Sequence, residues 1–220
     1  MSKPIVELTN VALKSDRGGT VFRDLNLKIM PGRSAIIIGP AGSGKTTLTE
    51  MLIGRRFADS GAVEVFGDLL TRRRKRVIRR VRKKIGGVGG PFELLPLLTV
   101  TENITLPLVL TATRKKIQRE RLRKALTEFS LLNQANQYPS KLTRVERTMV
   151  QLARASVANQ PLIIIDEPLA GLDVKTYRRI VDYLVKVAVS GRSMLILASE
   201  TPSTDLPETD YYEIVNGVLE

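Results

Sequence analysis

The pattern in residues 34–48 leaves few folds open to this chain. An apolar run leads to Gly39, and Gly44, Lys45 and Thr46 complete the spacing G-x-x-x-x-G-K-[ST] before a helical sequence begins. When a strand, a glycine-rich loop and a helix follow one another in this way, the N–H groups of the loop and the helix N-terminus face phosphate oxygens. The segment therefore predicts an α/β domain with a phosphate-binding loop, the alternative being a glycine-rich turn without a ligand.

The side chains at the end of this loop have separate expected roles. The Lys45 ammonium can reach the β and γ phosphates of a nucleotide, and the Thr46 hydroxyl can ligate Mg²⁺. The residues predicted to bind ATP are Gly39, Pro40, Ala41, Gly42, Ser43, Gly44, Lys45, Thr46 and Thr47.

Two adjacent carboxylates follow a second, continuously apolar run at residues 161–165. Carboxylates at the end of a buried strand do not serve packing, so Asp166 is predicted to hold Mg²⁺ together with Thr46. Glu167 is one residue further on, where it can orient or deprotonate the water that attacks the γ-phosphate. Glu167 and Lys45 are therefore the predicted catalytic residues. An acidic pair that merely caps the next turn is the alternative.

The composition restricts other chemistry. The chain has no cysteine and no histidine, which excludes disulfides, thiolate zinc sites and cysteine nucleophiles and removes the commonest general base. Its 220 residues suit one domain, and its formal charge of +13 favours an anionic partner such as a nucleotide, nucleic acid or lipid headgroups. No apolar run approaches the ~20 residues of a spanning helix, so we expect a cytosolic chain.

Short apolar runs alternate with stretches of helical spacing, which predicts an α/β fold. Near the end of the chain, Asn216-Gly217 predicts the turn of a β-hairpin. The predicted strands are Ile5–Leu8, Leu25–Ile29, Ala35–Ile38, Ala62–Phe66, Leu162–Ile165, Met194–Leu197 and Tyr212–Val215.

A contiguous helical block interrupts this alternation and is bounded by prolines. We expect a single domain over residues 1–220, in which residues 1–90 and 159–220 form a nucleotide-binding α/β core and residues 91–158 form an inserted helical lobe. The predicted helices of the lobe are Glu102–Leu110, Lys115–Phe129 and Val145–Val157.

With these motifs in place, the sequence resembles the ATP-binding subunits of ABC transporters from Ile5 to Leu219. Residues 94–108 are similar to the lipoprotein-release, macrolide-export and cell-division branch. Residues 166–168 and 169–173 match the family's Walker B motif and D-loop without a gap.

The resemblance implies a P-loop NTPase core of the ABC ATPase type, with an antiparallel β patch and an inserted helical lobe. It also implies ATP and Mg²⁺ as ligands, a homodimer or heterodimer with another ABC ATPase subunit, and a transmembrane subunit of a transporter complex as partner. The chain would then be peripheral on the cytosolic face of the inner (plasma) membrane.

Other landmarks of the family are replaced. Gly90 stands where the Q-loop glutamine is expected, and residues 142–146 read Leu-Thr-Arg-Val-Glu in place of LSGGQ. Glu200 stands in place of the switch histidine, and no aromatic residue near Asp16 can stack on adenine. Loss of a stacking ring costs ~1–3 kcal/mol, which ATP binding can survive, whereas each lost catalytic donor costs ~10²–10³ in rate. We therefore expect ATP binding with hydrolysis that is slow or depends on a partner.

Residues 71–84 form a strongly basic stretch. Val77, Ile78 and Val81 have helical spacing, which predicts a helix that docks by a narrow apolar stripe and presents its cations to solvent. In the family, a groove near this region receives the coupling helix of a transmembrane subunit. Anionic lipid contact through Arg72–Lys84 is one interpretation, and an ordinary solvated face is the other.

Three functions are compatible with these features. The first is an ATP-binding subunit of a membrane transporter or export complex, and the second is a catalytically inactive ATP-sensing regulatory or structural subunit. The third is a soluble ABC protein acting on nucleic acid, which the basic stretch favours. The absence of coiled-coil insertions, of a second ATPase domain and of a base-stacking aromatic cluster argues against it.

Overall fold

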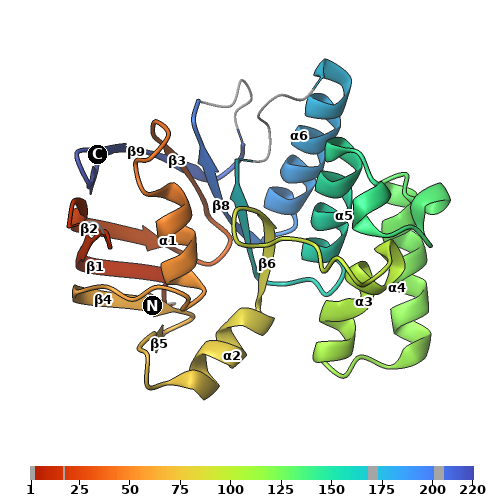
Figure 1. Cartoon of the computed structure of the whole chain (residues 1–220), viewed down its shortest axis with the longest axis horizontal. Helices are drawn as coiled ribbons and strands as arrows, with labels where there is room; N and C mark the ends of the chain where they lie inside the picture. Colours follow the sequence, from red (N-terminus) through yellow and green to blue (C-terminus); the bar gives the residue numbers. More distant parts are fainter. Residues whose placement is uncertain (1–2, 17, 168–172, 201–205) are drawn as a thin grey trace.

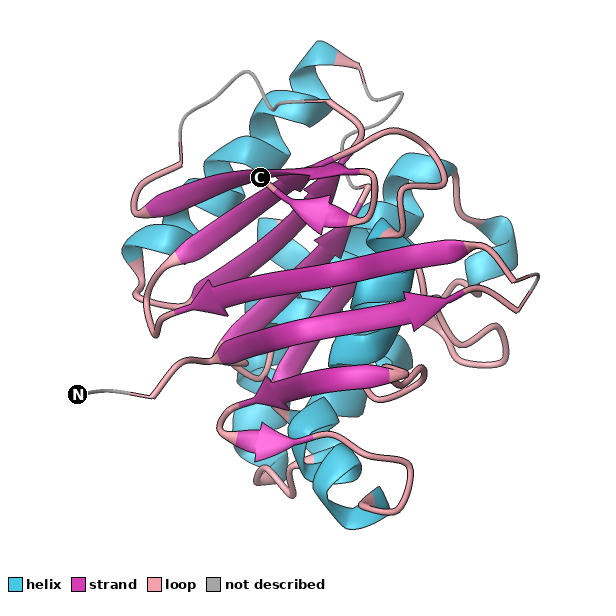
Figure 2. Cartoon of the chain, turned by 90° about the vertical axis from the view of Figure 1, so that its left-hand side faces the viewer, coloured by secondary structure: helices cyan, strands magenta, loops and turns pink. Residues whose placement is uncertain are grey.

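The computed structural model of the chain describes residues 3–16, 18–167, 173–200 and 206–220. Two β-sheets lie beside each other, and in the view of Figure 2 the helices lie behind them (Figures 1 and 2). The α/β class predicted from the sequence is confirmed.

The larger sheet is mainly parallel. Its strands are ordered β10-β9-β3-β8-β7-β6, and only β10 pairs antiparallel with its neighbour. The strands are β3 (Ser34–Ile38), β6 (Ile85–Gly89), β7 (Leu162–Asp166), β8 (Ser193–Ala198), β9 (Thr209–Val215) and β10 (Val218–Leu219).

The smaller sheet is antiparallel and has the order β2-β1-β4-β5. Its strands are β1 (Val6–Lys14), β2 (Thr20–Ile29), β4 (Ser60–Val65) and β5 (Asp68–Leu69). Strand β1 continues beyond the predicted end at Leu8. Its pairing with β2 shifts between Leu8 and Val11, where Asn10 has a φ of +48°. This bulge breaks the alternation of apolar residues on which the sequence prediction relied.

Six α-helices are described, and three of them lie between β6 and β7 in the chain. Figure 1 shows these three, α3, α4 and α5, grouped on the far side of the parallel sheet from the antiparallel one. The boundaries proposed at residues 90/91 and 158/159 stay predictions. The helices are α1 (Lys45–Leu52), α2 (Lys75–Lys83), α3 (Val100–Leu110), α4 (Lys115–Glu128), α5 (Arg144–Ser156) and α6 (Val174–Val189).

The parallel sheet is buried on both faces, which explains why its strands read as continuous apolar runs. In β3, Ala35 and Ile37 belong to one core cluster with Leu48 of α1. Ile36 points to the opposite face and joins the cluster that contains Ile104 of α3. Because side chains alternate along a strand, one short run supports both layers of the domain.

The predicted hairpin at the end of the chain is confirmed and joins the two sheets. Asn216 and Gly217 have φ values of +50° and +83°, as a two-residue turn of this type requires. The Gly217 carbonyl accepts a hydrogen bond from the Arg23 N–H of β2 at 3.0 Å. The hairpin tip is thereby fixed against the antiparallel sheet.

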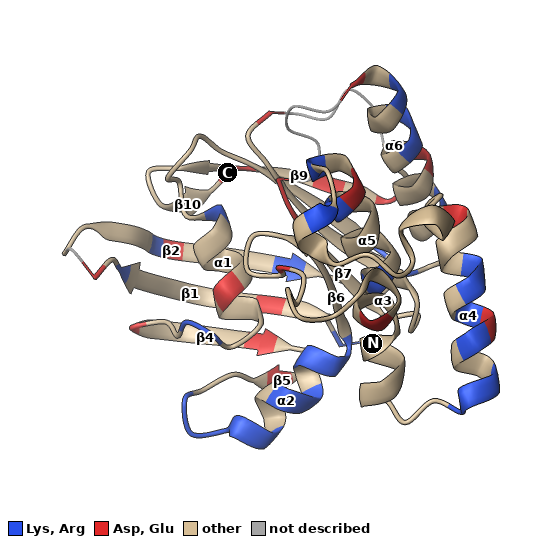
Figure 3. Cartoon of the chain, turned by 45° about the vertical axis from the view of Figure 1, so that its right-hand side comes forward, with Lys and Arg blue, Asp and Glu red and all other residues tan. Residues whose placement is uncertain are grey.

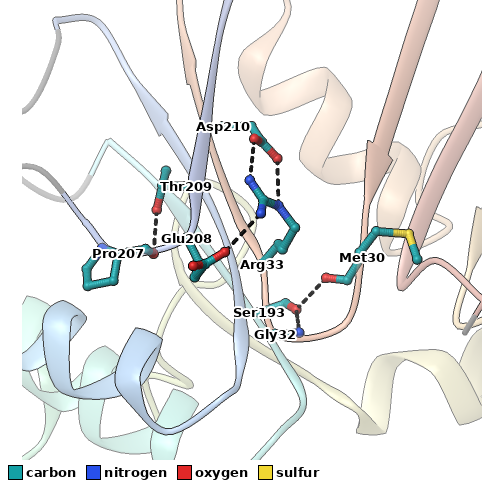
Figure 4. A network of polar contacts seen from close by, with 8 residues as sticks. All are labelled: Met30, Gly32, Arg33, Ser193, Pro207, Glu208, Thr209 and Asp210. Atoms are coloured by element: carbon teal, nitrogen blue, oxygen red, sulfur yellow. Dashed lines mark hydrogen bonds and ion pairs between the residues drawn. The ribbon is translucent and has the colours of Figure 1, made fainter.

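At the amino ends of β3, β8 and β9, a polar network fixes the turn between β2 and β3 (Figure 4). The fully buried Ser193 hydroxyl accepts from the Gly32 N–H at 3.0 Å and donates to the Met30 carbonyl at 3.2 Å. Arg33 donates to both carboxylate oxygens of Asp210, at 3.2 Å and 2.7 Å. The turn that precedes β3 is therefore tied to both neighbouring strands.

We expect Ser193→Ala to lower the free energy of unfolding by about 1–2 kcal/mol, because it leaves the Gly32 N–H without its partner and removes one of the two hydrogen bonds that the Met30 carbonyl accepts. For a chain of this size, each 1 kcal/mol corresponds to a fall in Tm of about 2–4 °C, which thermal denaturation measures. Thr209→Ala is the control, since it removes only an exposed hydrogen bond to the Pro207 carbonyl. Equal losses in the two variants would contradict the assignment.

Candidate functional site

The carboxyl ends of four parallel strands meet at one edge of the larger sheet. Ile38 pairs with Ala198, so β3 and β8 end side by side. Asp166 at the end of β7 pairs with Leu197 of β8 and with Gly89 of β6. Ligands of open parallel sheets bind at this edge, and the predicted site residues that the structure describes all lie there.

The glycine-rich loop leaves β3 and enters α1 through Gly44. This residue has a φ of +104°, and a Cβ atom on it would lie within 3.0 Å of side-chain atoms of Val21 and Phe22. Both conditions require glycine. Of the predicted ATP-binding residues, Gly39 and Lys45 are buried, Ser43, Gly44 and Thr47 are half-buried, and Pro40, Ala41, Gly42 and Thr46 are exposed.

The Lys45 ammonium is almost fully buried and lies among oxygens. Its Nζ donates to the Gly39 carbonyl at 2.5 Å and to the Pro40 carbonyl at 3.0 Å. Its third near partner is Oε1 of Glu167, at 3.2 Å. The structure thus brings together the two residues that the sequence predicts to be catalytic.

The Asp166 carboxylate is 2% exposed, and neither of its oxygens receives a hydrogen bond within the part of the chain that the structure describes. Burial raises the pKa of Asp166, and the nearby Thr46 hydroxyl opposes this shift although it makes no hydrogen bond of good geometry. Two unpartnered carboxylate oxygens beside a hydroxyl are hard oxygen donors of the kind Mg²⁺ prefers. The residues present therefore fit a magnesium ion.

Glu167 is held in a strained backbone conformation. Its φ is +55°, and its N–H donates to the Leu197 carbonyl of β8 at 2.9 Å. Its carboxylate accepts from the Ser199 hydroxyl at 2.5 Å and from the Ser199 N–H at 3.2 Å. Ser199 was not identified from the sequence, because nothing in the motif links β8 to this carboxylate.

The loop after β6 lies directly against Asp166. Gly90 has a φ of +44°, and a Cβ on it would be 2.1 Å from Oδ2 of Asp166. The preceding Gly89 N–H donates to Oε1 of Gln151, on α5, at 3.1 Å. The position predicted to lack the Q-loop glutamine is therefore beside the candidate metal ligand, in a place that admits no side chain in this conformation.

A second residue of α5 holds the other end of this loop. Arg154 donates to the carbonyls of Phe92 at 2.5 Å and Glu93 at 2.9 Å, and burial lowers its pKa to about 10. Gln151 and Arg154 were missed in the sequence, since their partners are backbone atoms about 60 residues away.

The start of α5 is closed by its own side chains. Thr143 and Glu146 form a reciprocal capping box, in which the Thr143 N–H donates to Glu146 at 2.8 Å and the Glu146 N–H donates to Thr143 at 3.2 Å. The Thr143 N–H lowers the pKa of Glu146, so the carboxylate is ionised. Gln134 also donates to it at 2.8 Å. An anionic side chain thus occupies the helix start at the position where the family resemblance predicts the signature motif.

The structure describes the remaining positions that the family resemblance singled out only in part. Glu200 is exposed and follows Ser199, and the exposed Asp16 accepts from Arg56 at 2.9 Å. Most of the D-loop match, residues 169–172, and the last residue of the Walker B match, residue 168, lie outside the described residues. Across the ranges that the structure does describe, no helix has the length and apolar character needed to cross a membrane.

The parallel strand order, the loop from β3 into α1 and the buried lysine with its carboxylate pair define a P-loop nucleotide-binding domain. A sequence profile described as "ABC transporter" matches residues 22–170, well over half of the chain. The chain therefore belongs to the ABC transporter family, as the sequence motifs predicted.

Individual relatives agree with this assignment. The chain is 32% identical over 203 residues to the "Lipoprotein-releasing system ATP-binding protein LolD 1" of Rhodopirellula baltica, covering 91% of this chain and 88% of the relative. It is 30% identical over 213 residues to the "Cell division ATP-binding protein FtsE" of Streptococcus pneumoniae, covering 97% and 93%.

A solved structure has the same fold. The dimeric ATP-binding cassette MJ0796, in a post-hydrolysis state bound to ADP and Pi, matches with a TM-score of 0.87 and 28% identity. The match covers 98% of this chain and 96% of that one. The predicted ABC ATPase type of fold is confirmed.

The unpartnered Asp166 carboxylate leads to a stability prediction. We expect Asp166→Asn to raise the Tm of the nucleotide-free protein at neutral pH, because the amide avoids the cost of a buried charge. Because the pKa of Asp166 is raised in the folded state, the folded chain still holds a proton at pH values where the unfolded chain has released it. The free energy of unfolding of the wild type therefore falls as the pH rises from the ordinary carboxyl pKa through the raised pKa. The gain in Tm from Asp166→Asn should accordingly be smaller at low pH.

Thermal denaturation at several pH values tests this expectation. Titration of Asp166→Asn with ATP, with and without Mg²⁺, should show weaker Mg²⁺-dependent binding than in the wild type. Asp182→Asn, an exposed position on α6, is the matched control. A lower Tm for Asp166→Asn than for the control variant at neutral pH would contradict the account of this carboxylate.

Placing glutamine at residue 90, where the family resemblance predicts one, should harm this chain. We expect Gly90→Gln to weaken Mg-ATP binding at least tenfold, because the new Cβ collides with Asp166 and the positive φ disfavours any side chain. Gly191→Gln is the control, since Gly191 also has a positive φ, of +74°, but a Cβ there meets nothing within 4 Å. If Gly90→Gln binds Mg-ATP with wild-type affinity or hydrolyses it faster, the loop after β6 can move away from Asp166 and the prediction is wrong.

Proposed function

We propose that this chain is the ATP-binding subunit of an ABC-type membrane transporter or export complex, with slow or partner-dependent hydrolysis. The observation that carries the proposal is the buried Lys45 ammonium, which contacts Glu167, together with the unpartnered oxygens of the neighbouring residue Asp166. The names of the relatives, which concern lipoprotein release and cell division, support the transport or export role.

The loop and the start of α1 supply the phosphate contacts. Backbone N–H groups and the positive end of the helix bind phosphate oxygens, and the buried Ser43 hydroxyl, which has no partner among the described residues, adds a further donor. Thr46 and Asp166 would hold Mg²⁺, which neutralises charge on the phosphates when bound.

Nucleotide binding requires Lys45 to change partners. The ammonium now contacts Glu167, whereas its function in the motif is to contact the β and γ phosphates. Phosphate therefore competes with the Glu167 carboxylate for the same cation. Once released, Glu167 is still oriented by Ser199 and can accept a proton from the attacking water.

Three features support slow hydrolysis. Gly90 offers no side chain to the reacting phosphate, Glu200 replaces an imidazole, and Glu146 places a negative charge at the start of α5. Each lost transition-state donor costs about 10²–10³ in rate. A catalytic partner subunit with intact motifs is the arrangement in which this chain would take part in turnover.

A groove beside the site fits the membrane subunit. It has a volume of about 250 Å³ and is lined by Phe92 from the loop after β6 and by Leu106 and Pro107 of α3, together with Arg82 and Arg154. Apolar walls with flanking cations suit a short amphipathic helix of a transmembrane subunit. The chain would then lie on the cytosolic face of the inner (plasma) membrane.

A second candidate is an ATP-sensing subunit that does not hydrolyse ATP. The self-capped start of α5 favours it, because an ionised carboxylate there repels the phosphate of a second subunit. This role retains ATP binding and the membrane partner but removes turnover.

Mg-ATP binding and single-turnover hydrolysis on the purified chain distinguish the candidates. Lys45→Ala should abolish binding, because the buried cation is lost. Glu167→Gln should bind Mg-ATP more tightly than the wild type, since the competing carboxylate is removed, and should not hydrolyse it. Glu120→Gln, exposed on α4, is the control and should behave like the wild type.

Wild-type binding followed by slow hydrolysis that is lost in Glu167→Gln supports the first function. Binding without any hydrolysis, alone and with a partner subunit, favours the ATP-sensing role. Absence of Mg-ATP binding in the wild type would overturn both.

A further inference from the structure

Helix α2 is fixed to the domain by one side and presents cations on the other. Ile78 and Val81 are buried, and Arg82 donates to the carbonyls of Ile53 at 2.6 Å and Gly54 at 3.1 Å. These contacts leave the helix no freedom to turn its basic side inward. The remaining Lys and Arg side chains of residues 72–84 are all exposed.

The cations of this segment are not balanced by nearby acids. Residues 70–92 contain no Asp or Glu. Among the described ion pairs, only Arg80 of this segment has an acidic partner, Asp68, at 2.6 Å. Arg72 and Lys84 lie over the rings of Phe57 and Phe66 instead. The segment therefore carries a large uncompensated positive charge on the surface.

A second exposed segment continues the same face. At the end of α3, Val109 and Leu110 are 57% and 52% exposed, and Lys115 and Lys116 follow at the exposed start of α4. Arg82 and Lys83 of α2 and Leu110 and Thr111 at the α3 end line one common groove, so the two segments lie near each other on the surface. Figure 3 shows α2 and the basic end of α4 along the same side of the molecule.

We propose that this basic face, defined as residues 72–84 and 109–119, binds directly to the surface of an anionic lipid bilayer. Two properties of this face occur together, namely an excess of exposed cations and a pair of exposed aliphatic side chains. Cations are attracted to anionic headgroups, and aliphatic side chains gain by entering the boundary between headgroups and acyl chains.

Nucleic acid satisfies only the first of these properties. Phosphate contacts use the cations but give Val109 and Leu110 no apolar environment. Binding of single strands also relies on aromatic side chains that stack on bases, and the basic face contains no aromatic residue. A bilayer uses both properties of the face.

Bilayer contact by the basic face does not depend on the proposed function, because it requires neither nucleotide nor a membrane subunit. It is therefore measured on the purified chain without ATP. Mg-ATP binding of each variant is measured separately, which distinguishes a failure of the basic face from a failure of the nucleotide site.

Vesicle sedimentation tests the proposal. The wild type should bind vesicles of phosphatidylcholine mixed with phosphatidylglycerol, and not phosphatidylcholine alone, with binding that weakens as salt rises. Each exposed cation near an anionic bilayer contributes roughly fivefold to binding, so Arg73→Glu/Arg76→Glu/Arg79→Glu should lose about 100-fold or more. Mg-ATP binding should be unchanged in this variant.

Two further variants separate bilayer binding at this face from a general effect of charge. Lys175→Glu/Arg178→Glu/Lys186→Glu makes the same charge change on the exposed side of α6 and should keep most of the vesicle binding. Val109→Ser/Leu110→Ser should weaken vesicle binding several-fold without a change in charge.

Three results would overturn the proposal. The first is wild-type binding to anionic vesicles no stronger than to neutral ones. The second is an equal loss in the α6 variant, which would reduce the effect to net charge. The third is tighter binding to nucleic acid than to anionic vesicles at the same salt, with no effect of Val109→Ser/Leu110→Ser, which would assign the face to nucleic acid.

Discussion

The buried ammonium of Lys45 requires oxygens around it, and the position of the other site residues follows from this requirement. A charge that is 6% exposed is costly unless partners surround it, and two loop carbonyls and the Glu167 carboxylate meet that need. Strands β3 and β7 are not neighbours, because β8 lies between them. The contact between Lys45 and Glu167 therefore spans β8, and Ser199 at the end of that strand fixes the carboxylate from the third side.

Close approach of backbone segments is the second constraint on the site. Gly89 and Gly90 let the loop after β6 rest on Asp166, where a Cβ at Gly89 would be 2.0 Å from the Asp166 carbonyl. Helix α5 keeps the loop in place through Gln151 and Arg154. The absence of a side chain at residue 90 and the packing of the loop are therefore one structural feature, which is the physical reason to expect that a side chain at residue 90 disturbs Asp166.

The sequence was informative where chemistry is encoded in short motifs and uninformative where contacts are distant. The phosphate loop, Asp166 and Glu167 were identified because glycine, lysine and carboxylate spacing is local. Gln151 and Arg154 were not, since a polar residue on an amphipathic helix gives no sign of the backbone group that it will contact. Strand β1 was predicted too short for a related reason, because Asn10 at its bulge makes hydrogen bonds with Asp24 and Asn26 of β2, which lie 14 and 16 residues away in the chain.

The loop after β6 also connects the nucleotide site with the groove. Gly90 touches Asp166, and Pro91, Phe92 and Glu93 line the groove. Arg154 holds these groove residues through two backbone carbonyls, while Gln151, one turn earlier on α5, holds Gly89. An occupant of the groove that shifts the loop must therefore alter the surroundings of Asp166. By linkage, a ligand at Asp166 then changes the affinity of the groove for its occupant by the same factor.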